Sequence, residues 1–170
     1  MATARGARFM GRWMPCSIGR GGFVRAEAKR EGDGATPAGV WRLTTLYWRP
    51  DRVSRPATCL PGVPLLHPTG WAEDPRDPAY NTEISHPHPF PADRMRRGDG
   101  LYDLCVATDH NTDPIVPGMG SAIFVHCWRR PRHPTAGCIA VHPADLRWIL
   151  RRWTPFSRLV IPFPKDGPGQ

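Results

Sequence analysis

The sequence lacks any apolar run that approaches the roughly 20 residues needed for a membrane-spanning helix. It also lacks long stretches free of helix breakers, because 17 glycines and 21 prolines are spread over its 170 residues. These absences exclude a helical bundle, a coiled coil and stable insertion into a membrane. No Gly-x-y period occurs, so the glycine and proline content does not indicate a collagen-like chain.

Cysteine is also scarce. Five cysteines without a CxxC pair are too few for a disulfide scaffold, and an odd number leaves at least one thiol unpaired within the monomer. An unpaired thiol is a buried apolar side chain, a metal ligand or a nucleophile. We expect ordinary buried thiols at three positions, Cys16, Cys59 and Cys105.

Acidic residues are outnumbered, with 15 Asp and Glu against 23 Lys and Arg and a formal net charge of +8. This excess suits an anionic partner such as nucleic acid, a membrane surface or a cell-wall polymer, and it also suits a solubilising surface. The arginines are scattered, and no aromatic and glycine spacing typical of an RNA-binding sheet occurs. The sequence therefore does not favour nucleic acid as the partner.

No signal peptide is recognisable, because the basic N-terminus MATARGARFMGRWMPC has neither an apolar core nor a cleavage pattern. Taken literally, this start indicates a cytoplasmic chain. A longer gene product trimmed at its start would give the same sequence.

The remaining pattern predicts one mainly β domain over residues 1–170, a β-sandwich or partly closed barrel with one clear helix and long loops. Strands are expected where β-branched and aromatic residues concentrate, at 40–48, 101–109, 121–128 and 157–163. Asp-Gly, Thr-Pro and Gly predict a turn cluster at 31–39. We expect the tail, 164–170, to fray.

The predicted helix covers about 143–153. Pro143 suits a first helical turn, and apolar side chains recur at helical spacing at Leu146, Ile149, Leu150 and Trp153. By contrast, residues 50–98 are dominated by Pro, His, Asp and Arg and show no clear periodicity. We expect a loop-rich insertion there, because long loops in compact domains are usually functional or locally structured.

Reactive side chains are densest between residues 126 and 142, where two chemistries compete. Cysteine and histidine could bind zinc at His126, Cys127, His133, Cys138 and His142. Adjacent strand residues point to opposite faces, however, so His126 and Cys127 cannot both enter one site, and the paired short spacings of a zinc finger are absent.

The second chemistry is a Cys–His nucleophile pair. A thiol needs a neighbouring base to react as a thiolate near neutral pH. His126 ends a predicted strand, which is a rigid platform, and Cys138 follows Gly137, where the chain can turn tightly and present backbone N–H groups to an oxyanion. Spacing alone leaves open that these are two core residues flanking a loop.

The segments GDGATPAG at 32–39 and HCWRRPRHPTAGCIAV at 126–141 together resemble the L,D-transpeptidase catalytic (YkuD-type) family, in a short, proline-rich branch. That family carries an early D-x-x-TP-x-G turn and, later, a histidine followed by an S/T-x-G-C loop. Both elements occur here in the same order. The resemblance covers roughly residues 16–162.

The resemblance implies roles for individual residues. Cys138 matches the nucleophile, His126 matches the catalytic histidine, and Gly137 and Thr135 match the loop before the nucleophile, whose N–H groups would form the oxyanion hole. Tyr80 and Asn81 stand where the branch has similar residues, and we take them with Thr135 as substrate-binding candidates.

Two positions depart from the family pattern. Ala136 replaces the second histidine of S-H-G-C, and Ala140 replaces an arginine that often follows G-C-I. Either a neighbouring arginine, Arg129, Arg130 or Arg132, supplies the missing positive charge for donor recognition, or these arginines only form a solvated basic loop.

The resemblance implies a cysteine peptidoglycan L,D-transpeptidase. Cys138 would attack the carbonyl after the third residue of a donor stem peptide, form a thioester and pass the acyl group to an amine of another stem. That amine would belong to a diamino acid side chain or to an N-terminal L-alanine. The partners implied are peptidoglycan stem peptides, with no cofactor or metal. Carbapenems would acylate Cys138 as mimics of the donor.

Other functions remain open from the sequence alone: an L,D-carboxypeptidase with water as acceptor, a non-catalytic wall-binding module, a zinc-binding module or a nucleic-acid binder. The resemblance favours a monomeric enzyme in the periplasm or cell envelope, despite the missing signal. It also suggests that residues 50–98 cover the site.

Overall fold

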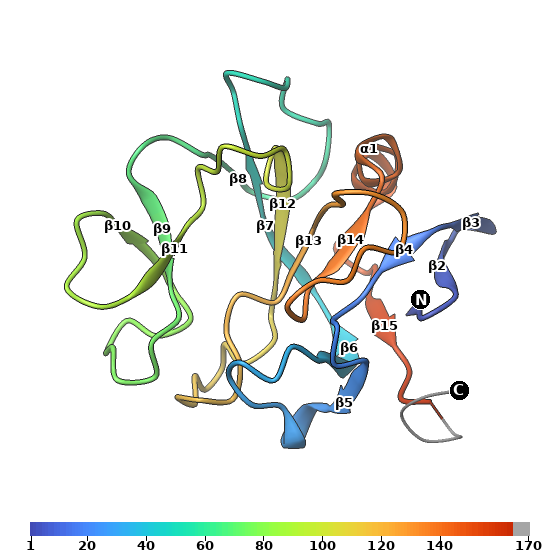
Figure 1. Ribbon diagram of the computed structural model, residues 1–170. Coiled ribbons are helices and arrows are strands. Elements are labelled where there is room, and N and C mark those ends of the chain that lie inside the picture. Colours follow the sequence, from blue (N-terminus) through green and yellow to red (C-terminus); the bar gives the residue numbers. More distant parts are fainter. Residues whose placement is uncertain (165–170) are drawn as a thin grey trace.

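A six-stranded sheet runs through the middle of the computed structural model, which describes residues 1–164 (Figure 1). Neighbouring strands are antiparallel, except that β13–β14 and β7–β8 are parallel. The strands are, in spatial order, β4 (Cys16–Ser17), β14 (Ile139–Val141), β13 (Phe124–Cys127), β12 (Leu104–Thr108), β7 (Leu43–Trp48) and β8 (Gly62–Pro64). Most of the predicted tail lies outside the described residues.

Three smaller sheets surround the central one. The first consists of β1 (Ala2–Thr3), β2 (Gly6–Phe9) and β3 (Arg12–Met14). The second is β15 (Leu159–Ile161), β6 (Thr36–Trp41) and β5 (Phe23–Arg25), and a 3-10 turn, η1 (Ala26–Ala28), follows β5. The third is β10 (Glu83–Ser85), β9 (Thr69–Ala72) and β11 (Ala92–Arg94). The structure thus confirms the predicted mainly β fold with long loops.

The predicted helix is α1 (Pro143–Arg152), and it ends one residue earlier than expected. His142 caps its start, because Nδ1 of this side chain accepts a hydrogen bond from the Ala144 N–H at 3.2 Å. Trp153 adopts an extended backbone and terminates the helix. The apolar stripe of the helix packs into the main core, which explains why helical spacing alone located it.

The central sheet is buried on both faces, so every residue of β12 is buried. Successive side chains of a strand alternate between faces. Leu104 and Val106 therefore pack in a first core with α1, β2 and β15. Cys105 and Ala107 pack in a second core beneath the β9–β11 sheet, and Cys138 belongs to this second core. The candidate site thus lies on the face of the central sheet opposite α1.

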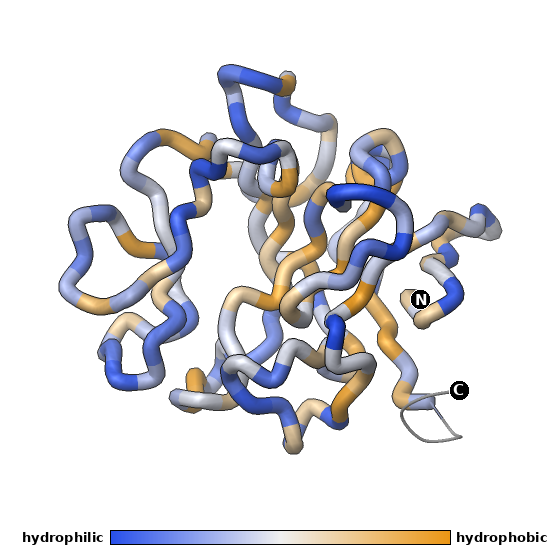
Figure 2. Tube along the Cα trace, viewed as in Figure 1, coloured by the Kyte–Doolittle hydropathy of each residue, from blue (hydrophilic) through white to orange (hydrophobic). Residues whose placement is uncertain are grey.

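Apolar residues line the central strands, whereas the outer loops, including the segment that follows β13, are hydrophilic (Figure 2). In the part of the chain that the structure describes, no helix has the length and apolar character needed to cross a membrane.

The strand predicted at 40–48 and the turn predicted at 31–39 both differ from the structure. The predicted strand 40–48 is broken at Arg42, where the chain passes from β6 to β7 in a different sheet. Asp109 holds this crossing point, since its carboxylate accepts hydrogen bonds from the Arg42 N–H at 2.7 Å and from Arg42 Nε at 2.9 Å. The predicted turn at 31–39 contains the start of β6 at Thr36, because pairing with β5 and β15 outweighs the local preference of Thr-Pro-Ala-Gly for a turn.

Cys59 is exposed, and the expectation of a buried thiol there was wrong. It lies in a loop, and its Sγ donates a hydrogen bond to the carbonyl of Trp153 at 3.2 Å. Cys16 and Cys105 are buried as expected. All five cysteines are free thiols.

Asp33, in the early motif, neutralises a buried lysine. The Lys29 side chain is only 3% exposed, and its Nζ contacts an Asp33 carboxylate oxygen. That carboxylate also accepts the N–H groups of Arg30 at 2.9 Å and Ala35 at 2.8 Å. Burial opposes ionisation of Asp33, but these hydrogen bonds outweigh it and lower the pKa of the carboxyl below its ordinary value of 3.8.

We expect Asp33→Asn to lower the free energy of unfolding by about 3 kcal/mol at neutral pH, because it leaves the Lys29 ammonium buried without a countercharge. A carboxyl whose pKa is lowered on folding contributes stability above its unfolded value and loses it as the pH falls through the folded value. The difference in the free energy of unfolding between variant and wild type should therefore become smaller below pH 3.8. Urea unfolding at neutral and acidic pH measures it, with exposed Glu27→Gln as control. A constant difference at all pH values would contradict this account.

Candidate active site

The loop before Cys138 makes contact with the early motif. Gly137 has φ +138°, and a Cβ there would lie 2.9 Å from the carbonyl oxygen of Ala35, so the position requires glycine. Thr36, next to Ala35, is fully buried and accepts a hydrogen bond from the Gly19 N–H at 2.8 Å. The two motifs, distant in sequence, therefore form one structural unit around the thiol.

Thr135 fixes the conformation of this loop. Its N–H donates to the carbonyl of Ile18, and its own carbonyl accepts from the Arg20 N–H, both at 2.9 Å. The side-chain hydroxyl donates to the carbonyl of Cys138 at 2.6 Å and accepts from the Gly137 N–H at 3.1 Å. The hydroxyl is thus engaged within the loop that presents Cys138.

The Cys138 thiol lies at the base of a cavity and is partly shielded. Its Sγ donates to the carbonyl of Ala122 at 3.0 Å and accepts from the Phe124 N–H at 3.4 Å. Burial, with a smaller effect from the carboxylates of Glu73 and Asp93, raises the pKa of the thiol to about 12. The group is therefore a protonated thiol in the resting protein.

The His126 ring projects from β13 and is buried. Its Nδ1 donates to the carbonyl of Cys127 at 2.8 Å, which leaves Nε2 as the basic nitrogen. The ring of Tyr102 packs edge-on against it, with 5.4 Å between ring centroids. Burial lowers the pKa of His126 to about 4, so the resting imidazole is neutral.

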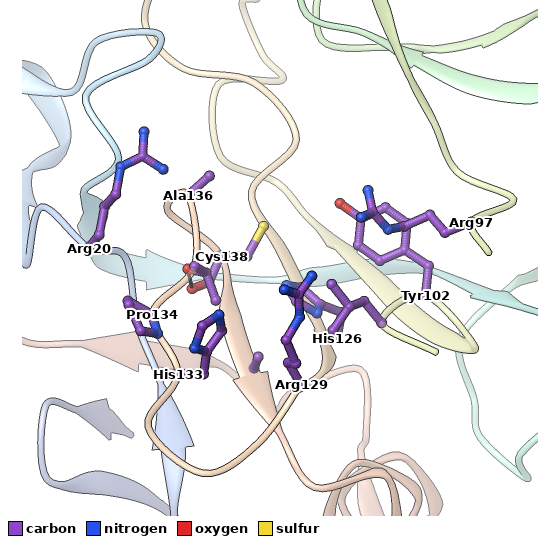
Figure 3. A pocket seen from close by; sticks show the side chains of 12 residues that line it. Arg20, Arg97, Tyr102, His126, Arg129, His133, Pro134, Ala136 and Cys138 are labelled. Atoms are coloured by element: carbon purple, nitrogen blue, oxygen red, sulfur yellow. Dashed lines mark hydrogen bonds between the residues drawn. The ribbon is translucent and has the colours of Figure 1, made fainter. Parts of the chain in front are cut away.

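His126 and Cys138 face the same side of the sheet. His126 is in register with Ala140 on β14, and Cys138 precedes Ala140 by two residues, which places it on the same face. Cys127 points the other way, into the first core. Both His126 and Cys138 line a cavity of about 290 Å³ (Figure 3). Within the described residues, no direct hydrogen bond joins their side chains.

The wall of this cavity is cationic. The guanidinium groups of Arg20, Arg97 and Arg129 line it from three different segments. Arg97 forms a two-pronged ion pair with Asp99, with both N–O distances at 2.9 Å, and Arg129 approaches the same carboxylate at 3.8 Å. Figure 3 shows Arg20 and Arg97 on opposite sides of the Cys138 sulfur. The arrangement favours an anionic ligand.

Tyr80 and Asn81 are not brought to this cavity. The Tyr80 hydroxyl donates to the Glu31 carboxylate. Asn81 Oδ1 accepts from Trp71 Nε1 at 3.1 Å and from the Ala122 N–H at 3.0 Å, and its amide nitrogen donates to two further carbonyls. Substrate binding by these two residues stays a prediction that their placement does not favour. Asn81 instead accepts the N–H of Ala122, and the carbonyl of the same residue accepts the hydrogen of the Cys138 thiol.

Three polar residues that line the cavity were not candidates in the sequence analysis: Arg20, Arg97 and Tyr102. The motif spacing gave no signal for them, because they come from separate loops that meet only in the folded chain. Two of the five candidate zinc ligands lie away from the cavity, since Cys127 is in the first core and His142 caps α1, whereas His126, His133 and Cys138 line the cavity. Among residues 1–164, no three His, Cys, Asp or Glu side chains are grouped to hold a metal ion.

Comparison with known proteins agrees with this geometry. The family model of the L,D-transpeptidase catalytic domain, YkuD, matches residues 5–161. The chain belongs to this family. No curated protein and no solved structure gave a match. Members of the L,D-transpeptidase family act on peptidoglycan in the cell envelope, so the resemblance noted in the sequence is confirmed at the level of the family.

Proposed function

We propose that the chain is a cysteine L,D-transpeptidase that cross-links peptidoglycan stem peptides. The observation that carries this proposal is the presence of Cys138 and the neutral His126 on one face of the sheet, in one cavity with a cationic wall. Together with membership of the family, this arrangement supports a nucleophile, a base and a site for an anionic peptide.

In the acylation step, Sγ of Cys138 attacks the carbonyl carbon after the third residue of the donor stem while its proton passes to Nε2 of His126. The resting thiol and imidazole are both neutral, so the proton moves as the S–C bond forms rather than beforehand. The tetrahedral intermediate then expels the amine of the terminal D-residue, which takes the proton from His126 Nε2. A thioester on Cys138 remains.

The loop at 135–138 supplies the environment for the oxyanion. The hydroxyl of Thr135 occupies the Gly137 N–H, so we assign the backbone N–H of Cys138 as the donor to the developing negative charge. The positive φ of Gly137 permits the turn that orients this peptide group.

In the second step, an amine of another stem attacks the thioester, and Cys138 leaves as the thiol after proton return through His126. The acceptor is the side-chain amine of a diamino acid or an N-terminal L-alanine amine, and water in its place gives an L,D-carboxypeptidase. A protein with this chemistry is expected to act in the periplasm or cell envelope, where its peptidoglycan substrate lies.

We also propose that residues 50–98 cover the site. Trp71 and Met95 from this segment pack in the second core with Cys138, and Arg97 forms part of the cavity wall. The segment carries its own three-stranded sheet, which gives a cover more rigid than an open loop.

Incubation of the purified protein with disaccharide-tetrapeptide muropeptides, followed by mass spectrometry, tests the proposal. The expected products are a cross-linked dimer and the released D-residue, and fragmentation of the dimer identifies the acceptor amine. A tripeptide product without dimer would indicate the carboxypeptidase. Substrate recovered unchanged, with no thioester on Cys138, would refute both enzymatic functions.

A further inference from the structure

Arg20 is tied to the nucleophile loop through its backbone. Its N–H donates to the carbonyl of Thr135 at 2.9 Å, and the adjacent Gly19 forms an isolated bridge with Thr135. The position of Arg20 relative to Cys138 is therefore set by the same hydrogen bonds that hold the loop. Arg20 itself is an exposed residue of a turn next to this bridge, and its side chain lines the cavity.

Gly34 directs the Arg20 side chain. A Cβ on Gly34 would lie 3.0 Å from both Cγ and Nε of Arg20, so the side chain passes directly over this glycine. Gly34 has φ +67°, which also disfavours other residues there. Because Gly34 of the early motif has no side chain, the Arg20 side chain can pass over it and reach the cavity beside Ala136 (Figure 3).

Arg20 differs from the other two arginines of the cavity in its charge balance. Arg97 and Arg129 both lie near the Asp99 carboxylate, whereas Arg20 has no acidic side chain within ion-pair distance among residues 1–164. A guanidinium group has five N–H donors arranged to bind a carboxylate with two parallel hydrogen bonds. Arg20 therefore offers an unused carboxylate-binding group on the wall of the cavity that holds Cys138.

The neighbouring positions leave room for such a ligand. Ala140, which stands where the family pattern often has arginine, lines the same cavity, and so does Ala136. Both side chains are a single methyl group, so no cation projects from the nucleophile loop itself. Arg20 therefore adds its positive charge to that of Arg97 and Arg129 from a segment more than a hundred positions before the nucleophile loop.

We propose that Arg20 determines donor specificity by binding a carboxylate of the acyl-donor stem peptide, an inference that rests on the proposed transpeptidase function. The carboxylate is either the terminal one of the leaving D-residue or a side-chain carboxylate of the third residue. Both present the same two oxygens to the guanidinium group, and substrates amidated at one or the other position separate them.

The test measures steady-state kinetics of Arg20→Gln and Arg20→Lys with the unmodified donor and with each amidated donor. Loss of a charge-assisted pair should raise KM of Arg20→Gln about 10- to 100-fold with kcat little changed. Amidation of the bound carboxylate should raise KM of the wild type by a similar factor and leave that of Arg20→Gln unaffected. Arg20→Lys should retain part of the affinity, since it keeps the charge but not the two-pronged geometry.

Arg151→Gln is the matched control, because it removes the same charge from an exposed position on α1 that does not line the cavity. The assignment would be overturned if wild type and Arg20→Gln had equal KM values, or if Arg151→Gln raised KM as much as Arg20→Gln does. It would also be overturned if each amidation of the donor raised KM of Arg20→Gln as much as it raises KM of the wild type. Thermal unfolding of each variant verifies that the fold is intact. Failure of the transpeptidase proposal is distinguishable, because the wild type would then form no product from any donor.

Discussion

Cys138→Ala is expected to abolish thioester formation and lower the rate of cross-linking at least about 10³-fold, because Cys138 is the only thiol among the residues that line the cavity. The measurement is dimer yield from purified muropeptides, together with the intact mass of the protein after exposure to a carbapenem. The wild type should gain one drug molecule, and the variant should gain none.

Cys59→Ala is the matched control for this experiment. Cys59 is the exposed thiol, and its Sγ contacts the Trp153 carbonyl rather than the cavity, so its removal should leave both the cross-linking rate and the drug adduct unchanged. Cys138→Ser tests the chemistry more finely, since a hydroxyl is a weaker nucleophile in the same position. Undiminished cross-linking by Cys138→Ala would remove the basis of the proposed mechanism.

His126→Gln should lower kcat/KM by about 10²- to 10⁴-fold, because glutamine cannot accept the thiol proton or return it to the leaving amine. The ring also occupies buried space against Tyr102, so the glutamine variant, which is similar in size, tests the chemistry with less disturbance than alanine would. His67→Gln, at an exposed position outside the cavity, is the control.

The pH profile gives an independent readout of the same residue. Burial lowers the pKa of His126 from its ordinary value of 6.5 to about 4. The base must be unprotonated to act, so its function is present above the folded pKa and lost as the pH falls through it. Acylation by a donor without titrating groups should therefore remain level from neutral pH downwards and decline only near pH 4. A midpoint near 6.5 would show that the ring is not desolvated during the reaction.

His126 and Cys138 could be singled out as a candidate pair from the sequence because the constraints on both residues are local. Alternation along a strand separates His126 from Cys127, and the structure places them on opposite faces of the central sheet. Gly137 was recognisable from the motif, although the reason for it, the carbonyl of Ala35, lies in a distant segment. Helical spacing likewise located α1 to within one residue.

Sequence patterns are less informative where a side chain's environment depends on distant segments. Tyr80 and Asn81 resembled substrate-binding residues by position, yet their polar atoms bond to Glu31, Trp71 and Ala122 inside the protein. Arg20 carried no motif, because its importance arises only when its segment pairs with the loop before Cys138. Periodicity and short motifs encode contacts along the chain, whereas these contacts cross between sheets.

The pairing of residues 18–20 with Thr135 has a consequence for folding during synthesis of the protein. Residues 18–20 leave the ribosome or an export channel long before the nucleophile loop does. The thiol consequently cannot acquire its surroundings until nearly the whole sequence is free to fold, and closure across so long a stretch of chain is slow. The surroundings of Cys138 are thus among the last parts of the fold to form, and a chain arrested before Thr135 emerges lacks the pairing with residues 18–20 altogether.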